Sequence, residues 1–165
     1  RRFDCSQVSD GAVAAIFATE EGLEKLGIDP AECVEVMDYG VSTAPLGDVD
    51  DYTELDNTKR AVTDVYSSTG LGPSDIDVAE VHDCFAITEL LMYEALGFAD
   101  AGKGAELVEN GETTLDGRIP VNPGGGLIAF GHPVGATGVK QVLEIYRQMK
   151  GNAATTSCRR PRRSD

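Results

Sequence analysis

The chain has two histidines, and each lies in a short motif whose other residues could take part in chemistry. His82 is followed by Asp83 and Cys84, and His132 lies in a glycine-rich stretch from 131 to 138. Imidazole exchanges protons near neutral pH more readily than other side chains, and Cys84 adds a thiol two positions from His82. The two motifs together predict an acid–base site built around His82, Cys84 and His132.

The elements around His82 would place it at the edge of a sheet. Residues 78–81 are predicted to form a strand and residues 85–96 a helix. A residue that follows a strand in an open α/β sheet faces the crevice where ligands bind, so His82 and Cys84 are expected there. The free N–H groups at the start of the helix would favour a thiolate at Cys84. Asp83 is interpreted as a cap of that same helix.

Two glycine-rich stretches, residues 122–126 and 131–138, indicate a second part of the site. Glycines without a side chain allow the backbone to approach a ligand closely. Neither stretch has the GxGxxG or GxxxxGK[ST] pattern of a nucleotide-phosphate loop. The residues predicted to bind substrate are Asn122, Gly124, Gly125, Gly131 and Gly135.

Strands that alternate with helices predict an α/β fold. The predicted strands cover residues 12–18, 33–38 and 78–81. The predicted helices are a short one that ends near Gly27, one over 57–69 that ends at Gly70, and two more over 85–96 and 134–149. Residues 100–126 are expected to cross the surface, with one amphipathic turn at 105–108. The core face of the last helix is predicted to be Val139, Val142, Leu143 and Tyr146.

Composition excludes several classes of function. The chain has 28 acidic and 14 basic residues, a net charge of −14, whereas a surface that binds nucleic acid needs clustered lysine and arginine. No membrane span is expected, because no segment approaches the roughly 20 apolar residues that one requires. The tail over residues 151–165 has no hydrophobic period and is predicted to be disordered or aberrant. Because the first residue is Arg1 rather than Met, we expect the chain to be part of a longer protein.

The cysteines favour a reduced, cytoplasmic protein. The four cysteines form no CxxC pair, which is not typical of a disulfide framework. A zinc site formed by His82, Cys84 and His132 would have only three ligands at tight spacing, with no carboxylate motif to complete it, so no metal is expected. The remaining cysteines, interpreted as structural or incidental, are Cys5, Cys33 and Cys158.

Three segments, taken together, resemble a known enzyme family. They are His82-Asp83-Cys84-Phe85, Asn122-Pro123-Gly124-Gly125-Gly126-Leu127-Ile128 and Gly131-His132-Pro133-Val134-Gly135-Ala136-Thr137-Gly138. Their order and spacing resemble the C-terminal half of a thiolase of the sterol-carrier-protein (SCP2) type, and Ser9-Asp10-Gly11-Ala12 resembles the strand that closes the N-terminal half. The resemblance implies a thiolase-like fold in which a mixed sheet is covered by helices, here incomplete at both ends.

The resemblance also implies roles for individual residues. His132 matches the histidine that activates a nucleophilic cysteine of the N-terminal half and helps to bind the thioester oxygen. His82 matches the residue that completes this oxyanion hole, and Cys84 matches the cysteine that moves a proton at the substrate's α-carbon. Preorganised donors of this kind stabilise a developing enolate. The implied reaction is Claisen condensation or thiolytic cleavage between acetyl-CoA and a 3-ketoacyl-CoA, with a coenzyme A thioester as substrate and no permanently bound cofactor.

Two departures from the family define the predicted domains. No cysteine other than Cys84 lies in a context that matches the family, and after Lys150 the chain lacks the apolar strands that the family has. We therefore predict that the isolated chain has no thiolase turnover. The predicted divisions are the closing strand of the N-terminal thiolase half at 1–18, the C-terminal thiolase domain at 19–150 and the tail at 151–165.

Two other functions stay open at this point. One is a thiolase-like aldolase, a lyase that cleaves a β-hydroxyacyl-CoA without an acyl-enzyme. The other is a non-catalytic thiolase-like domain that serves as a binding or assembly module. The resemblance further implies a homodimer for the full-length protein, and association with a small OB-fold, zinc-ribbon protein of the kind that accompanies bacterial and archaeal relatives.

Overall fold

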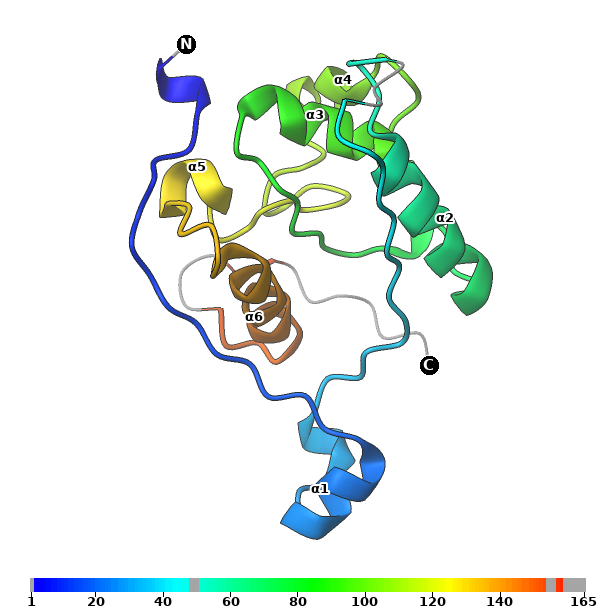
Figure 1. Ribbon diagram of the computed structural model, residues 1–165, viewed down its shortest axis with the longest axis vertical. Coiled ribbons are helices and arrows are strands. Elements are labelled where there is room, and N and C mark those ends of the chain that lie inside the picture. The colour runs from blue at the N-terminus through cyan, green and yellow to red at the C-terminus, as the bar shows by residue number, and fades with distance from the viewer. Residues whose placement is uncertain (1, 48–50, 154–156, 159–165) are drawn as a thin grey trace.

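The computed structural model describes residues 2–47, 51–153 and 157–158 (Figure 1). Its α-helices are α1 (Glu20–Leu26), α2 (Asp56–Thr69), α3 (Ala86–Ala95), α4 (Gly104–Glu109), α5 (Gly126–Phe130) and α6 (Thr137–Met149). Three short 3-10 helices are η1 (Arg2–Asp4), η2 (Pro30–Glu32) and η3 (Pro73–Asp75).

Extended segments meet only at single points within the described residues. The isolated bridges are Cys5 with Phe85, Val8 with His132 and Ala79 with Val121. The first is antiparallel and the other two are parallel. The helical part of the predicted α/β fold is therefore present, whereas a continuous sheet is not seen in this part of the chain.

The core lies between α3, α4 and the two segments that meet at the bridge between Ala79 and Val121. Tyr93 of α3 and Leu107 of α4 are buried in it, and Ile119 is fully buried. The prediction that residues 100–126 cross the surface is therefore wrong for the end of that range. The physical reason is that residues 119–122 pair with the segment of Ala79: the Asn122 N–H donates a hydrogen bond to the Ala79 carbonyl, which places these residues in the core.

Helix ends agree well with the sequence. The predicted stops at Gly27 and Gly70 are confirmed, since both glycines follow a helix with positive φ values of 65° and 72°. Thr19 caps α1 by accepting a hydrogen bond from the Gly22 N–H. These signals depend on neighbours in sequence, which explains why they could be read without the fold.

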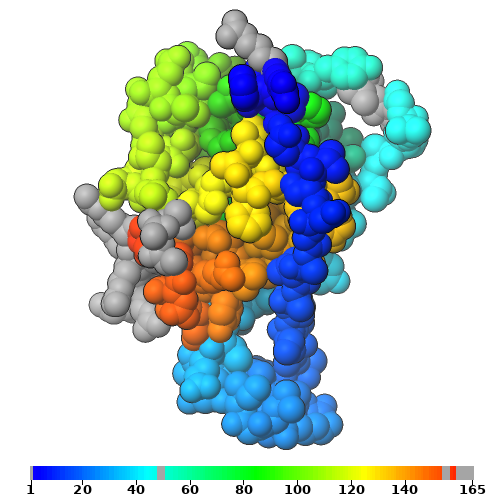
Figure 2. Space-filling view, turned by 90° about the vertical axis from the view of Figure 1, so that its left-hand side faces the viewer, coloured from blue at the N-terminus to red at the C-terminus, as the bar shows by residue number. Residues whose placement is uncertain are grey.

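Residues 2–40 form an extended arm that runs along one side of the body and carries α1 away from it (Figures 1 and 2). The buried strand predicted at 12–18 and the alternating strand predicted at 33–38 are wrong for this structure, because neither segment is assigned as strand. Their large side chains are exposed, with Ile16 at 93% and Met37 at 63%. A strand needs a neighbour for its backbone hydrogen bonds, and the described residues supply none here.

The predicted last helix is present as α6, but its orientation is the reverse of the predicted one. The side chains of Glu144 and Gln148 are buried, while Val139, Val142 and Tyr146 are exposed by 36%, 45% and 40%. The predicted core face is therefore wrong for these three residues, and Leu143 is half-buried. The polar face of α6 meets the body instead: Lys140 Nζ lies 3.8 Å from Glu80, and Glu144 packs against Gly124.

The tail is only partly described. Ala153 is buried, and the Cys158 N–H donates to Gln148 Oε1 on α6. Residues 154–156 and 159–165, to which the prediction of a disordered tail also applied, lie outside the described residues. In the described part of the chain, no helix is long and apolar enough to cross a membrane.

Candidate active site

His82 and His132 lie next to each other although fifty positions separate them in sequence. Their ring centroids are 5.0 Å apart, and the ring planes meet edge to face at 81°. Both side chains are partly buried. The structure thus brings together the two predicted imidazoles, at a separation that allows one small polar group to contact both.

A short N-terminal segment, residues 5–9, joins the two motifs. At one end the Ser6 N–H donates to the Cys84 carbonyl over 2.9 Å. At the other end the His132 N–H is within hydrogen-bond distance of both the Gln7 carbonyl, at 3.0 Å, and Ser9 Oγ, at 3.1 Å. This segment therefore fixes the backbone of both motifs relative to each other.

Asp83 joins the same two motifs from the inside. Its carboxylate is buried and accepts hydrogen bonds from the backbone N–H groups of Leu127, at 2.7 Å, and Ile128, at 3.2 Å. Asp83 therefore caps α5 and not α3, the helix that follows it, so the predicted cap is wrong. A carboxylate stabilises free N–H groups at a helix start. The helix start that Asp83 stabilises lies 44 residues away in sequence.

The ring of His132 is held by Thr137, at the start of α6. Nδ1 of the imidazole lies 2.7 Å from Thr137 Oγ1, and the same hydroxyl donates to the Pro133 carbonyl over 3.1 Å. Sequence reasoning missed both Thr137 and Asp83 as functional residues. The signal for Thr137 was its place five positions after His132 in the glycine-rich motif.

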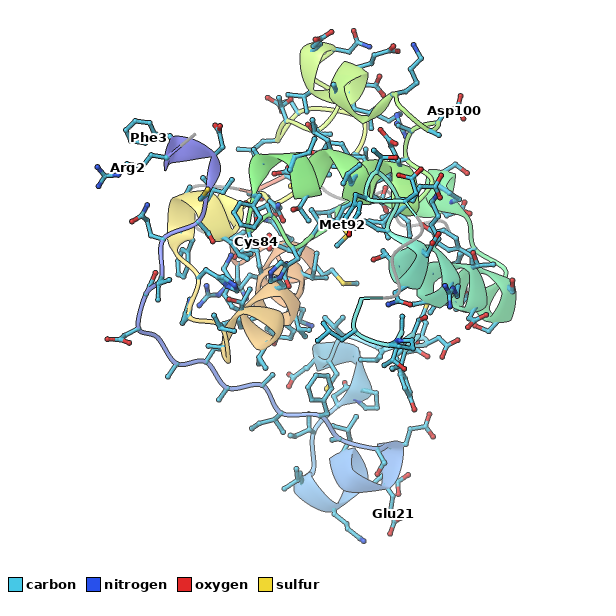
Figure 3. All side chains as sticks on the ribbon, turned by 45° about the horizontal axis from the view of Figure 1, so that its top comes forward. Arg2, Phe3, Glu21, Cys84, Met92 and Asp100 are labelled. Atoms are coloured by element: carbon cyan, nitrogen blue, oxygen red, sulfur yellow. The ribbon has the colours of Figure 1, made fainter. Side chains whose placement is uncertain are left out.

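Cys84 lies between α5 and the start of α3, close to the centre of the molecule (Figure 3). Its side chain is partly buried and the thiol is free. Cys84 lies two residues before the first residue of α3, which agrees with its predicted place at the start of that helix. Its use as an acid or base remains a prediction.

Comparison with known proteins identifies the family. Residues 39–164 match the family model described as "Thiolase C-terminal domain-like", which is more than half of the chain. The chain belongs to this thiolase family.

Several thiolase-family proteins are similar over most of the chain. Rabbit (Oryctolagus cuniculus) sterol carrier protein 2 is 44% identical over 90% of the chain and 28% of that protein. The acetyl-CoA acetyltransferase of Methanothermobacter thermautotrophicus is 42% identical over 93% of the chain and 40% of that protein. The benzoylsuccinyl-CoA thiolase subunit BbsB of Thauera aromatica is 36% identical over 88% of the chain and 38% of that protein.

A solved structure has the same fold over part of its length. The "Ltp2-ChsH2(DUF35) aldolase" superposes with a TM-score of 0.61 at 25% identity, covering 70% of this chain and 31% of that chain. Together with the sequence relatives, this means that the chain spans between a quarter and two fifths of the thiolase-family proteins that it matches.

The predicted substrate-binding residues of this thiolase domain have different surroundings. Asn122 is buried and its Oδ1 accepts a hydrogen bond from the Val81 N–H over 2.9 Å, so it holds the backbone just before His82. Gly124 packs against Glu144, and Gly125 immediately precedes α5. A role for these three residues in binding substrate stays a prediction.

The other two predicted glycines lie on either side of His132. A side chain on Gly131 would collide with Ser9 Oγ, so this glycine allows the N-terminal segment to reach the histidine. Gly135 has open space around it and lines a cavity of about 390 Å³ between residues 9–13 and 133–136. The cavity adjoins the His132 loop.

Burial and the neighbouring His132 favour a neutral imidazole at His82. Burial, followed by the neighbouring His132, lowers the pKa of His82 below its usual range, while Asp83 opposes this shift. A neutral imidazole has one N–H donor and one acceptor, as an oxyanion site with proton transfer needs. Among the described residues, no cluster of three or more histidine, cysteine or acidic side chains could hold a metal ion.

Proposed function

We propose that this chain supplies the oxyanion-binding and proton-transfer groups of a thiolase that acts on coenzyme A thioesters. The observation that carries the proposal is the edge-to-face contact between His82 and His132, with ring centroids 5.0 Å apart. Membership of the thiolase family, shared with an acetyl-CoA acetyltransferase and a benzoylsuccinyl-CoA thiolase subunit, supports the substrate class. Residues 19–150 would form the C-terminal thiolase domain, and residues 1–18 the closing strand of an N-terminal half.

The proposed chemistry assigns one step to each residue. Cys84 takes the α-proton of the thioester, and the electron pair of the C–H bond moves onto the thioester oxygen. His82 stabilises the charge on that oxygen by hydrogen bonding, and His132 would do so after its Nε2 has taken the proton of the nucleophilic cysteine of the N-terminal half. The resulting enolate carbon would attack an acyl group held as a thioester on the nucleophilic cysteine of the N-terminal half, whose thiolate is the leaving group. Coenzyme A would leave earlier, when that cysteine takes the acyl group, and the reverse sequence is thiolytic cleavage. Asn122, Gly124, Gly125, Gly131 and Gly135 would line the substrate path.

Exchange at the α-carbon tests this assignment without the full reaction. We expect acetyl-CoA incubated with the chain in D₂O to take up deuterium at its methyl group faster than in buffer, as measured by mass spectrometry. The Cys84→Ser and His132→Ala variants should lose most of this enhancement, about 10²-fold or more for a general base. The same samples should show no thiolysis of acetoacetyl-CoA, because the acyl-accepting cysteine is not among the matched residues. Exchange equal to buffer, or unchanged in both variants, would contradict the proposal.

An aldolase is the second candidate, favoured by the structural similarity to the Ltp2-ChsH2(DUF35) aldolase. Such an enzyme would use the same proton-transfer groups to cleave a β-hydroxyacyl-CoA into a carbonyl compound and a shorter acyl-CoA. Product analysis separates the two: thiolysis consumes free coenzyme A, and aldol cleavage does not. A third candidate, a non-catalytic assembly module, predicts neither product and no exchange.

A partner protein follows from the same comparison. The name of the solved aldolase couples Ltp2 with ChsH2(DUF35), and we propose that this chain, in its full-length form, also forms a dimer and associates with a small protein of that kind. Size-exclusion chromatography with light scattering, followed by mass spectrometry of any co-purified chain, tests both points. A monomer that co-purifies with no second protein would contradict them.

A further inference from the structure

Thr137 has the position of a residue that acts through His132. Its side chain is buried, with 3% exposed, at the first residue of α6. Its hydroxyl oxygen lies 2.7 Å from His132 Nδ1 and 3.1 Å from the Pro133 carbonyl oxygen. The hydroxyl therefore sits between one group that can only accept a hydrogen bond and one nitrogen that can either donate or accept.

Proton counting decides how the three groups are joined. A hydroxyl has one hydrogen, and the Pro133 carbonyl has none. If the hydroxyl donates to Pro133, its lone pairs face Nδ1, which must then carry a hydrogen. In the opposite arrangement the hydroxyl would donate to Nδ1, and two oxygen lone pairs would face each other across 3.1 Å with no hydrogen between them. The Pro133 carbonyl also accepts the Ala136 and Thr137 backbone N–H groups, over 2.8 and 3.0 Å. The first arrangement is therefore favoured because it places a hydrogen between the two oxygens and leaves a hydroxyl lone pair for Nδ1–H.

We propose that Thr137 is a positioning residue that holds neutral His132 as the Nδ1–H tautomer. Nε2 then carries the lone pair and is the nitrogen able to take a proton. The use of Nε2 in catalysis rests on the proposed function, whereas the tautomer itself is a property of the folded chain. Catalytic histidines are commonly held in one tautomer by a hydrogen bond at the other nitrogen.

The surroundings of His132 support a fixed ring. Its backbone N–H is held by the Gln7 carbonyl and Ser9 Oγ, so the Cα position is set from the N-terminal segment. The edge-to-face contact with His82 limits rotation from the other side. Thr137 contacts Nδ1 and so distinguishes the two ring nitrogens.

Nitrogen-15 NMR of the imidazoles tests the tautomer directly. The full 165-residue chain, labelled at histidine, is measured at a pH where His132 is neutral, and a His82→Gln variant assigns the two rings. We expect His132 Nδ1 to show the shift of a protonated, pyrrole-type nitrogen and Nε2 the shift of an unprotonated one. If the wild-type spectrum shows His132 Nε2 protonated and Nδ1 unprotonated, the proposal is overturned without any variant.

Three variants separate positioning from stability. Thr137→Val removes the hydroxyl and should move the two nitrogen shifts toward each other, as both tautomers become populated, whereas Thr137→Ser should restore the wild-type shifts. Thr69→Val is the matched control, because Thr69 also donates to a carbonyl four residues earlier but contacts no imidazole. It should lose comparable stability and leave the His132 shifts unchanged. Unchanged shifts in Thr137→Val would contradict the inference.

The two proposals fail in different ways. Loss of α-proton exchange with the expected tautomer intact would argue against the proposed function alone. A reversed tautomer in a chain that still exchanges α-protons would argue against the role of Thr137 alone. The NMR measurement needs no substrate and no turnover.

Discussion

The carboxylate of Asp83 occupies the space that a side chain at position 126 would need. Gly126 has a φ of +60°, and a Cβ atom built on it would collide with both carboxylate oxygens of Asp83. The same oxygens accept hydrogen bonds from the next two backbone N–H groups, so the glycine and the carboxylate form one structural unit. This unit ties the start of α5 to the motif that contains His82 and Cys84.

Gly126→Ala should destabilise the chain by about 2 kcal/mol or more. A non-glycine residue at a positive φ costs roughly 1–3 kcal/mol, and the new methyl group would also displace Asp83. Unfolding by urea, followed by circular dichroism, measures the change. Gly135→Ala is the control, because no heavy atom lies within 4 Å of its Cβ position; it should change stability by less than about 0.5 kcal/mol. Equal losses in the two variants would show that the Asp83 contact is not needed.

Asp83→Ala tests the carboxylate from the other side. Loss of a helix cap costs about 0.5–2 kcal/mol, and here one buried and one partly buried N–H group would also lose their acceptor, so we expect the upper end or beyond. Asp29→Ala removes an exposed cap, the bond from the Ala31 N–H over 2.9 Å, and should cost less. Thermal unfolding of both variants against wild type gives the comparison. A smaller loss for Asp83→Ala than for Asp29→Ala would contradict this account.

The sequence predicted those features that depend on near neighbours. The helix stops at Gly27 and Gly70 follow from the left-handed conformation that glycine adopts easily, and the existence of α2, α3 and α6 follows from hydrophobic spacing. The motifs of His82 and His132 could be singled out because their residue types are chemically distinctive.

What the sequence could not predict depends on contacts between distant segments. Residues 12–18 have the composition of a strand, but strand formation needs a neighbouring backbone that composition does not reveal. Asp83 is a residue type that often caps the helix following it, yet the N–H groups it accepts from are 44 and 45 residues away. Both predictions are wrong for the same reason: the local pattern does not show which distant segment supplies the partner.

Buried Glu80 should make stability fall as the pH rises. Burial raises the pKa of this carboxyl group to about 7, Glu144 and Asp83 add to the shift, and Lys140, with Nζ 3.8 Å away, opposes it. Since the folded pKa lies above the unfolded value near 4.5, the folded chain binds more protons between these values. The stabilising effect is complete below about pH 4.5 and is lost as the pH rises through about 7.

Glu80→Gln removes this dependence and gives the test. The difference in unfolding free energy between the variant and wild type should move in favour of the variant by on the order of 2–3 kcal/mol from pH 5 to pH 8. Taking the difference also removes the opposite contribution of His82, whose lowered pKa reduces stability on acidification below about 6.5. Glu21→Gln, which removes an exposed carboxyl group, is measured beside it as the control for a change of charge alone. A flat difference for Glu80→Gln would mean that its carboxyl group titrates normally.

The reversed orientation of α6 can be tested by substitutions on its two faces. Val142 is 45% exposed, so Val142→Ser should change the free energy of unfolding by less than about 1 kcal/mol. Leu127 on α5 is 2% exposed, and Leu127→Ala should cost about 2–5 kcal/mol. If the sequence-based orientation of α6 were correct instead, Val142 would be a core residue and its replacement by serine would rank with Leu127→Ala. Urea unfolding of the two variants under one condition therefore decides between the hydrophobic pattern, which predicts a buried Val142, and the structure, in which Glu144 and Gln148 on the other face are buried.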